Sequence, residues 1–513
     1  MPKTKIDWAK CSQKAREHYG VKRLRPGQRD LIETVLNGKS AMGIMATGAG
    51  KSLCYQLPAL FLPLATVVVS PLLSLMQDQT LKLEEAGVDA TKLDSTLTQS
   101  EERQAIKDVK NGRSELVYVT PERLENPEYL EILKKGGVSL LVIDEAHCVS
   151  QWGHDFRPAY LSIRQAAKAL GNPPILALTA TATPSVEKDI LDQLGIPNAP
   201  VFSTGVDRDN LVFEVYRTVN EESKFKRLLQ IIHDNHNSGT GIAYVSTVKS
   251  ANELHSQLLR VGITAGKYHG KMKMSDREAF QQDFMDNRYQ IMIATKAFGL
   301  GIDKPDVRFV VHYNFPDSVE SYYQEAGRAG RDGKRAIAAL LYRLEDKRVH
   351  SYFLGGKYPT RAHASTLYET ILKLTEGGTQ ATTLKAISES SQIANNKVRV
   401  LLAYLDKEGI IQRTRGIKLI KKLDDTESIE IFLKHYDDRF HSDRERIETI
   451  MKYGQTTECR AEFIREYFGK DRGKACRQCD NCRGKFLEPS AIIESEIATM
   501  AGAPRSQNPC SHS

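Results

Sequence analysis

Seven short runs rich in Val, Ile and Leu recur along residues 40–345, and stretches with helical periodicity separate them. Strands that are apolar on both faces and alternate with helices are typical of parallel sheets covered by helices on both sides. The series is too long for one sheet, so we predict an α/β fold with two doubly wound parallel-sheet domains that meet near residues 202–210. The runs are ATVVVS (65–70), ELVYVT (115–120), LLVIDE (140–145), ILALTA (175–180), GIAYVS (241–246), IMIAT (291–295) and VRFVVHY (307–313).

Length and composition limit the class of protein. A chain of 513 residues exceeds what one hydrophobic core supports, and 41% hydrophobic with 27% charged residues is ordinary for a globular protein. It has no apolar run of about 18 residues and no apolar signal segment, so we expect no membrane span. We therefore expect a cytoplasmic, nucleoid-associated protein if the source is bacterial, and a nuclear one if it is eukaryotic. The net charge of +8 permits a nucleic-acid partner without requiring one.

The stretch GIMATGAGKS (43–52) has the features of a phosphate-binding loop. Glycines let backbone N–H groups turn toward an anion, a lysine reaches the β- and γ-phosphates, and a hydroxyl ligates Mg²⁺. The strict pattern begins with Gly, where this chain has Met45, and a chance Gly-rich turn is the alternative interpretation. The predicted nucleotide-binding residues are Thr47, Gly48, Ala49, Gly50, Lys51 and Ser52.

Two acids follow the apolar run that ends at residue 143. At a strand end, Asp144 is placed to hold Mg²⁺ through water, and Glu145 to orient or deprotonate the attacking water. Further along, SYYQEAGRAGRDG (321–333) places Arg328 and Arg331 three residues apart on a Gly-rich turn, which suits an arginine finger from the second domain. Gln324 of the same stretch joins the candidate catalytic set. Solvated loop acids and a basic surface turn are the alternatives.

An aromatic and basic loop, QWGHDFRP (151–158), stands directly behind the acid pair. Aromatic side chains stack on bases without sequence preference, and Arg adds a phosphate or cation–π contact. We therefore predict that the loop contacts single-stranded DNA and couples DNA binding to the acids. An interdomain core position for the aromatic residues is the alternative. The predicted DNA-binding residues are Trp152, His154, Phe156 and Arg157.

Four of the eight cysteines crowd into residues 459–482. Such short spacing suits a structural, tetrahedral Zn²⁺ site, although an iron–sulfur cluster also uses four thiolates. We predict zinc ligands at Cys459, Cys476, Cys479 and Cys482. The remaining cysteines, 11, 54, 148 and 510, are expected to be buried or tail residues in a reducing compartment.

A locally basic segment lies ahead of the cysteines, because residues 397–422 carry eight Lys or Arg and two acids. Helical stretches at 363–377, 382–392 and 394–409 precede two short strand-like runs, IIQRT and IKLIKK, which is a winged-helix order. We predict duplex DNA binding at a fork through phosphates; a helical spacer is the alternative, and the wing is short and lacks an aromatic tip. The candidate DNA contacts are Lys397, Arg399, Arg413 and Arg415.

Several motifs occur in the order seen in superfamily 2 helicases: the phosphate loop, DEAH (144–147), TAT (181–183), ATKAFGLGIDKPDVR (294–308) and QEAGRAGRDG (324–333). LRPGQ (24–28), QWGHDFRP and the cysteine module narrow the resemblance to the RecQ family of DNA helicases. The resemblance implies two RecA-like domains with ATP between them and 3′ to 5′ movement on single-stranded DNA. It also implies adenine contacts from Arg25 and Gln28, a DNA-backbone contact near Ser70, and a cleft position for Asp303.

The order of the parts departs from that family. Here 125 residues separate Gly333 from Cys459 and 31 follow Cys482, so we expect the winged-helix-like unit to lie ahead of the zinc module. The expected function is an ATP-dependent DNA helicase that acts as a monomer on single-stranded and fork DNA, with single-strand-binding protein as a candidate partner. An RNA helicase and an ATP-gated DNA-binding factor that does not unwind are the alternatives. The predicted units are 1–204, 205–345, 360–425, 426–485 and a tail at 486–513.

Overall fold

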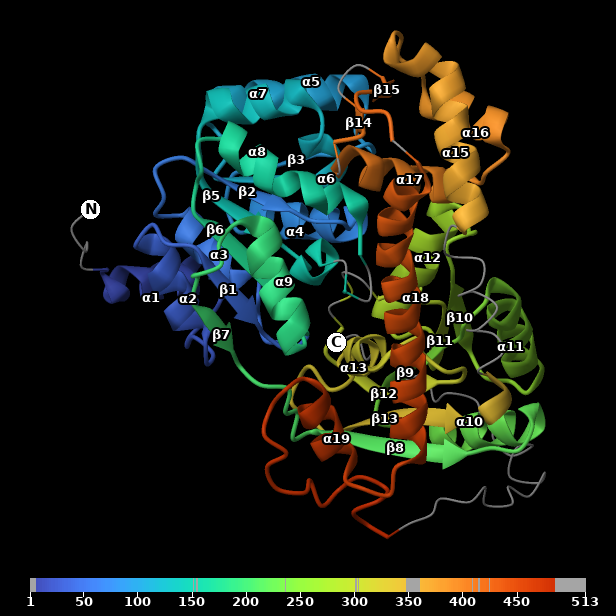
Figure 1. Cartoon of the computed structure of the whole chain (residues 1–513). Coiled ribbons are helices and arrows are strands. Elements are labelled where there is room, and N and C mark those ends of the chain that lie inside the picture. Colours follow the sequence, from blue (N-terminus) through green and yellow to red (C-terminus); the bar gives the residue numbers. More distant parts are fainter. Residues whose placement is uncertain are drawn as a thin grey trace.

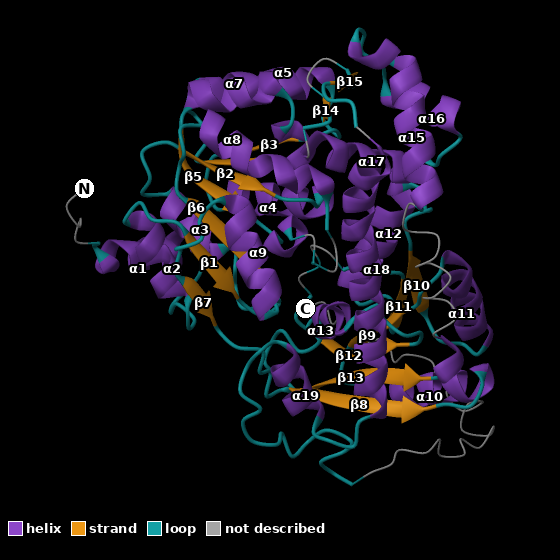
Figure 2. Cartoon of the chain, in the orientation of Figure 1, coloured by secondary structure: helices purple, strands orange, loops and turns teal. Residues whose placement is uncertain are grey.

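The structure is a computed structural model in which residues 6–150, 152–153, 156–235, 237–299, 302, 304–346, 360–407, 409–413, 416–423 and 425–484 are described. Two sheets, each flanked by helices, lie one above the other, and a further group of helices lies beside them (Figures 1 and 2). Within the described ranges, no helix combines the length and the apolar character needed to cross a bilayer.

The first domain is built on a seven-stranded sheet in the order β3-β4-β2-β5-β6-β1-β7, and every neighbouring pair is parallel. Side chains alternate between its two faces, because Val67 and Val69 enter one core cluster while Val68 enters another. The strands are β1 (Ala41–Ile44), β2 (Ala65–Val69), β3 (Ala90–Leu93), β4 (Leu116–Val119), β5 (Val138–Ile143), β6 (Ile175–Thr179) and β7 (Val201–Ser203).

Nine α-helices of the described residues belong to this first domain. Several start where the sequence supplies a cap; Thr98, for example, accepts from the N–H of Glu101 in a capping box. The helices are α1 (Trp8–Tyr19), α2 (Gln28–Leu36), α3 (Leu53–Ala59), α4 (Leu73–Glu85), α5 (Gln99–Lys110), α6 (Pro121–Leu124), α7 (Pro127–Gly136), α8 (Ile163–Ala169) and α9 (Pro184–Leu194).

The second domain repeats the design with a six-stranded parallel sheet in the order β10-β11-β9-β12-β13-β8. Val310 and Val311 enter the core clusters on its opposite faces. Its strands are β8 (Leu211–Arg217), β9 (Thr240–Tyr244), β10 (Ala265–Tyr268), β11 (Ile291–Ala294), β12 (Val307–His312) and β13 (Ala336–Tyr342), and its helices are α10 (Glu221–Asn235), α11 (Val248–Arg260), α12 (Met274–Met285) and α13 (Val319–Ala326). The predicted pair of doubly wound parallel sheets is confirmed.

A small helical unit with its own core follows the second domain. It contains α15 (Arg361–Leu374), α16 (Leu384–Ser391), α17 (Asn395–Lys407) and an antiparallel hairpin of β14 (Ile411–Gln412) and β15 (Lys418–Leu419). An isolated β-bridge also pairs Thr382, just before α16, with Ile417, just before β15. Three helices and a hairpin were predicted here, and each helix lies within a few residues of its predicted place. The hairpin strands are only two residues long. That the unit is a winged helix stays a prediction.

The 31-residue helix α18 (Asp425–Gln455) connects this unit to the zinc module and runs along the second domain, where it contacts α13 (Figure 1). After α18 the chain forms α19 (Arg460–Tyr467) and the loop that carries three of the four cysteines. Cys11, Cys54 and Cys148 are buried, as expected, while Cys510 and the predicted tail at 486–513 lie outside the described residues.

Candidate ATPase site and zinc module

The phosphate loop connects β1 to α3, as its sequence predicted. Gly48 and Gly50 have φ angles of 82° and 81°, a left-handed conformation that favours glycine. A Cβ on Gly50 would also lie 2.7 Å from Nε2 of Gln28. Within the loop, the ammonium group of Lys51 donates to the carbonyl of Met45 at 3.3 Å.

Arg25 and Gln28 brace this loop from the N-terminal segment. The guanidinium of Arg25 donates to the carbonyl of Gly48, and Nε2 of Gln28 donates to the carbonyl of Gly50 at 2.9 Å. Oε1 of Gln28 in turn accepts from the N–H of Arg25 at 2.7 Å. Both side chains line the same cleft as Lys51, so their predicted contact with adenine stays a prediction that the placement supports.

The acid pair directly follows β5 and faces the phosphate loop. Burial and the adjacent charge of Glu145 together raise the pKa of Asp144 to about 7, while the charge of Lys51 opposes the shift. Glu145 has a φ of 47°, an uncommon conformation for a residue with a Cβ, and such strain clusters at functional sites. Its carboxylate lies 3.3 Å from Nδ1 of His147.

The second domain supplies the opposite wall of the cleft through α13 and the turn that follows it. A Cβ on Gly48 would lie 3.3 Å from Cγ of Arg331, so this arginine reaches the phosphate loop. Arg331 donates to the carbonyl of Ile302 at 2.6 Å, and Arg328 donates to the carbonyl of Gly299. Both arginines therefore stand in the cleft.

The cleft has a volume of about 440 Å³ and gathers most of the predicted nucleotide-site residues from both domains. Ala49 is half-buried and packs against a core cluster instead, and Asp303 lies outside the described residues. The roles assigned to single residues stay predictions. Those brought together are Arg25, Gln28, Thr47, Gly48, Gly50, Lys51, Ser52, Asp144, Glu145, Gln324, Arg328 and Arg331.

The loop behind the acid pair packs closely onto it. A Cβ on Gly153 would lie 2.2 Å from the carbonyl oxygen of His147, so only glycine fits there. The hydroxyl of Tyr160, just past the loop, donates to the carbonyl of Asp144 at 3.3 Å. Gly153 and Tyr160 thus contact the backbone of the segment that holds the acids.

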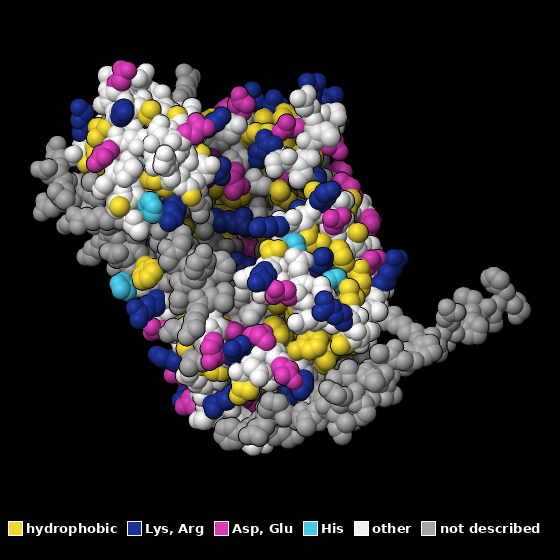
Figure 3. All heavy atoms as spheres, turned by 90° about the vertical axis from the view of Figure 1, so that its right-hand side faces the viewer, with side chains coloured by type: hydrophobic (Ala, Val, Ile, Leu, Met, Phe, Trp, Pro, Cys, Tyr) yellow, Lys and Arg dark blue, Asp and Glu magenta, His cyan; other side chains and the backbone are white. Residues whose placement is uncertain are grey.

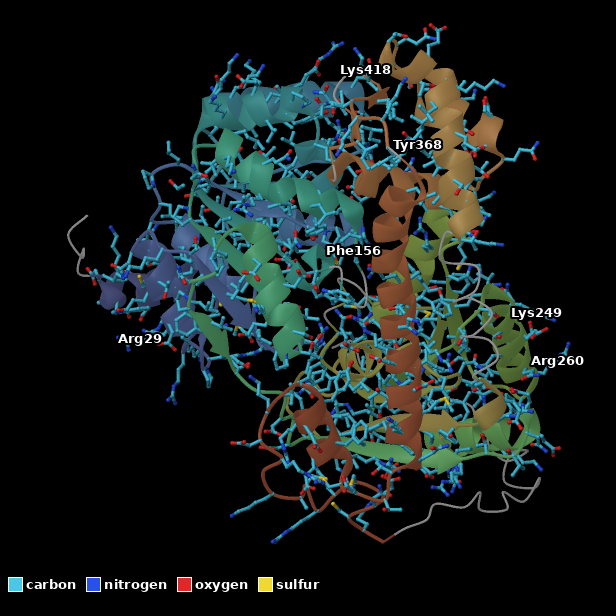
Figure 4. All side chains as sticks on the ribbon, viewed as in Figure 1. Arg29, Phe156, Lys249, Arg260, Tyr368 and Lys418 are labelled. Atoms are coloured by element: carbon cyan, nitrogen blue, oxygen red, sulfur yellow. The ribbon has the colours of Figure 1, made fainter. Side chains whose placement is uncertain are left out.

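Two aromatic residues of this loop lie on the side of the first domain that faces α18. Trp152 is 37% exposed and lines a groove with residues of α18, and Figure 4 places Phe156 on the same side. Arg157 donates to the carbonyl of Pro71 at 3.0 Å, which ties the loop to the neighbouring segment. Ser70 in that segment is buried, so its contact with DNA stays a prediction, and His154 lies outside the described residues.

The basic residues of the helical unit are on α17 and beside β14. Lys397 is half-buried, while Arg399 and Arg413 are exposed. Burial raises the pKa of Glu125 in the first domain, and the charge of Arg413 opposes that shift, so Arg413 lies near this acid. Arg415 is outside the described residues. DNA contacts by these side chains stay predictions.

The four predicted zinc ligands come together. Their Sγ atoms all lie within 4.8 Å of one another, and those of Cys476 and Cys482 are 3.9 Å apart. Tetrahedral Zn²⁺ with bonds of about 2.3 Å separates its sulfurs by about 3.8 Å. A cluster of several iron atoms would hold its cysteines farther apart, so the spacing favours a single zinc ion.

Backbone donors support the thiolates of this site. The N–H groups of Cys476, Cys479 and Cys482 donate to the Sγ atoms of Cys459, Cys476 and Cys479 at 3.2, 3.3 and 3.4 Å. Such bonds stabilise the deprotonated form that a metal requires.

A buried ion pair that the sequence did not predict anchors the zinc module to β8. Nε and Nη2 of Arg460 donate to the two carboxylate oxygens of Asp480 at 3.0 and 2.9 Å, and each side chain is 4% exposed. The same carboxylate accepts from the N–H of Val215 at 3.3 Å. Arg483 adds an ion pair with Glu214 on the same strand.

Comparison with known proteins agrees with this architecture. Models for the DEAD/DEAH box helicase, the helicase conserved C-terminal domain and the RecQ zinc-binding module match residues 25–190, 223–333 and 419–483. Among solved structures, Dbp5 of S. cerevisiae bound to RNA and ADP BeF3 has a TM-score of 0.54 and 20% identity, and covers 67% of this chain and 90% of that one. A structure of the DUF1998 helicase MrfA bound to DNA has a TM-score of 0.55 and 19% identity, and covers 83% and 64%. The family models and the fold define the class, a protein with two RecA-like helicase domains.

Sequence relatives give the narrower assignment. The ATP-dependent DNA helicase RecQ of Bacillus subtilis is 43% identical over 339 residues, which are 66% of this chain and 57% of that protein. The probable ATP-dependent DNA helicase RecS of the same organism is 41% identical over 65% of this chain and 66% of its own length. The chain belongs to the RecQ family, and it spans between about half and two thirds of the length of these curated relatives.

Proposed function

We propose that this chain is an ATP-dependent DNA helicase of RecQ type, which moves 3′ to 5′ along single-stranded DNA and unwinds duplex DNA during repair and recombination. One observation carries the proposal: the phosphate loop and acid pair of one domain face Arg328 and Arg331 of the other across a single cleft. Sites of this kind make ATP binding close the domains and hydrolysis release them.

Within the cleft each residue has a defined task. Lys51 binds the β- and γ-phosphates, and Glu145 positions the attacking water and accepts its proton. Ser52 and, through water, Asp144 would hold Mg²⁺, which offsets charge on the phosphates when it is bound. Arg331 and Arg328 approach from the second domain and stabilise the charge that develops on the transferring phosphoryl group.

The loop at Trp152 and Phe156 couples this chemistry to DNA. The exposed indole and the half-buried phenyl ring are suited to stacking on bases, while Gly153 keeps the loop against the DEAH segment. Figure 3 shows Lys and Arg side chains gathered in a hollow near the middle of one face, which supports a path for a polyanion.

The helical unit of α15–α17 completes the proposal as a winged-helix-like contact for the duplex ahead of the motor. Arg399 is exposed for phosphate contact, and Lys397 and Arg413 lie on the same unit. The chain acts as a monomer in this scheme, with single-strand-binding protein as a candidate partner.

The short hairpin favours a second candidate, an ATP-gated DNA-binding factor that does not unwind. Each strand of this hairpin has only two residues, so the hairpin offers only a small wedge for separating base pairs. A helicase can also carry its strand-separating wedge elsewhere. The two candidates therefore share the same ATPase domains and differ only in whether the duplex is unwound.

Strand separation decides between them. Duplex DNA with a 3′ tail and with a 5′ tail is incubated with ATP and Mg²⁺, and Lys51→Ala serves as the control without hydrolysis. Unwinding of the 3′-tailed duplex alone supports the helicase; DNA-stimulated hydrolysis without unwinding supports the second candidate. Stimulation by RNA in place of DNA would point to an RNA helicase and contradict both.

A further inference from the structure

Arg208, in the segment between the two sheets, binds four backbone carbonyls with one guanidinium. Nη1 donates to Thr47 at 3.3 Å and to Gly327 at 3.1 Å, while Nη2 donates to Ala329 at 2.9 Å and Gly330 at 3.0 Å. Thr47 belongs to the phosphate loop of the first domain, and Gly327, Ala329 and Gly330 belong to the turn that carries Arg328 and Arg331. One side chain therefore joins both walls of the ATP cleft.

These bonds fix the geometry of the turn because the guanidinium is planar and its donors have a set orientation. Burial lowers the pKa of Arg208, which indicates that its guanidinium is partly desolvated. The dipoles of the four carbonyl groups stabilise the buried cation. The domains also approach closely here, since a Cβ on Gly327 would lie 3.3 Å from Cβ of Thr47. The guanidinium group of Arg208 lies beside that contact and donates to the carbonyls of both Thr47 and Gly327.

The segment around Arg208 is itself clamped on both sides by the zinc module. Arg465 donates to the carboxylate of Asp207 at 2.8 Å, and Nε2 of Gln478 donates to the carbonyl of Asp209 at 2.9 Å. From the second domain, the buried hydroxyl of Tyr323 donates to the carbonyl of Val206 at 2.7 Å. Arg208 is thus the end of a fixed chain of contacts that begins beside the zinc ligands.

We infer that Arg208 is a positioning residue for ATP hydrolysis, which fixes the Arg328–Arg331 turn against the phosphate loop while the zinc module holds Arg208 in place. The inference rests on the proposed ATPase function. Transition-state stabilisation depends on placement, and an error of about 1 Å can reduce the rate about 10²-fold. Nucleotide binding depends chiefly on Lys51 and the loop itself, so it should be largely spared.

The test compares Arg208→Ala and Arg208→Lys with the wild type in steady-state ATP hydrolysis at saturating single-stranded DNA. Both variants should lose about 10²-fold in kcat, with KM for ATP and the affinity for a fluorescent ADP changing by less than about threefold. Lys retains the charge without the fork, which guards against a folding defect in the Ala variant. Arg260→Ala, on the outer surface of α11, is the matched control (Figure 4).

A double variant separates positioning from general stability. If Arg208 acts through Arg331, the variant with both Arg208→Ala and Arg331→Ala should hydrolyse ATP no more slowly than Arg331→Ala alone. Arg465→Gln should also lower kcat, but by a smaller factor than the Arg208 variants, and its zinc content should equal that of the wild type.

Wild-type kcat in both Arg208 variants, multiplicative losses in the double variant, or a joint loss of kcat and ADP affinity with a lowered Tm would each overturn the inference. Absence of ATP hydrolysis in the wild type would instead contradict the proposed function.

Discussion

Replacing Arg460 by Ala should destabilise the zinc module and weaken its binding of zinc. The substitution leaves the carboxylate of Asp480 buried, with the N–H of Val215 at 3.3 Å as its remaining donor among the bonds described above. Breaking one partner of a buried ion pair costs about 3–5 kcal/mol. We expect the lower end, about 3 kcal/mol, because that backbone donor persists.

This cost has a measurable consequence for zinc. Folding of a small metal module and binding of its metal are one process, so a loss in module stability appears as weaker zinc binding. About 3 kcal/mol corresponds to about a 10²-fold lower apparent zinc affinity. Competition with a chromogenic chelator at fixed pH measures that ratio directly.

Arg472→Ala is the matched control in the same module. Arg472 lies near three acids, with Nη2 at 2.7 Å from the carboxylate of Glu458, yet its side chain is 47% exposed. Exposed pairs are worth less than about 1 kcal/mol, so this variant should keep its zinc. Equal zinc affinities in the wild type and Arg460→Ala, or an equal loss in Arg472→Ala, would refute the reasoning from burial.

Three further predictions concern the motor. Lys51→Ala should abolish ATP hydrolysis, measured as phosphate release, and wild-type rates in it would exclude the assigned site. The raised pKa of Asp144, about 7, means that the carboxyl must lose a proton before it can hold Mg²⁺. Affinity for Mg²⁺–nucleotide should therefore rise about tenfold per pH unit up to about pH 7 and then level off, whereas a flat profile would contradict the assignment. Trp152→Ala should keep ATP binding but lose stimulation by DNA, and unchanged stimulation would remove the coupling role.

The sheets were predictable because burial on both faces forces continuous apolar runs into the sequence. VRFVVHY became β12 and ILALTA became β6. The grouping of the candidate nucleotide-site residues was predictable for a related reason. Strand ends of a parallel sheet share one edge, so residues after β1 and after β5 must meet although about 90 positions separate them in the chain.

The contacts across the cleft could not be predicted, because no comparable pattern in the sequence indicates them. Arg208 lies 161 positions from Thr47 and 119 from Gly327, and its partners are backbone carbonyls, which any residue supplies. The pair of Arg460 and Asp480 is closer in sequence, but charged residues at such positions are usually solvated, so only the folded module shows that both are buried. Strand β7 was not predicted, because a run of three residues has no visible periodicity.

The helical unit can lie ahead of the zinc module and leave both parallel-sheet domains intact, because α18 provides the length. A helix of 31 residues spans about 46 Å, enough to connect the unit beside the first domain with cysteines that return to β8. Along its course Arg446 pairs with Asp443 at 2.7 Å and lies 3.8 Å from the carboxylate of Glu320 in α13, the helix that leads into the arginine turn. The helical unit is thus attached to α18, a helix that packs on the second domain. The zinc module still contacts β8, although the helical unit precedes it in the chain.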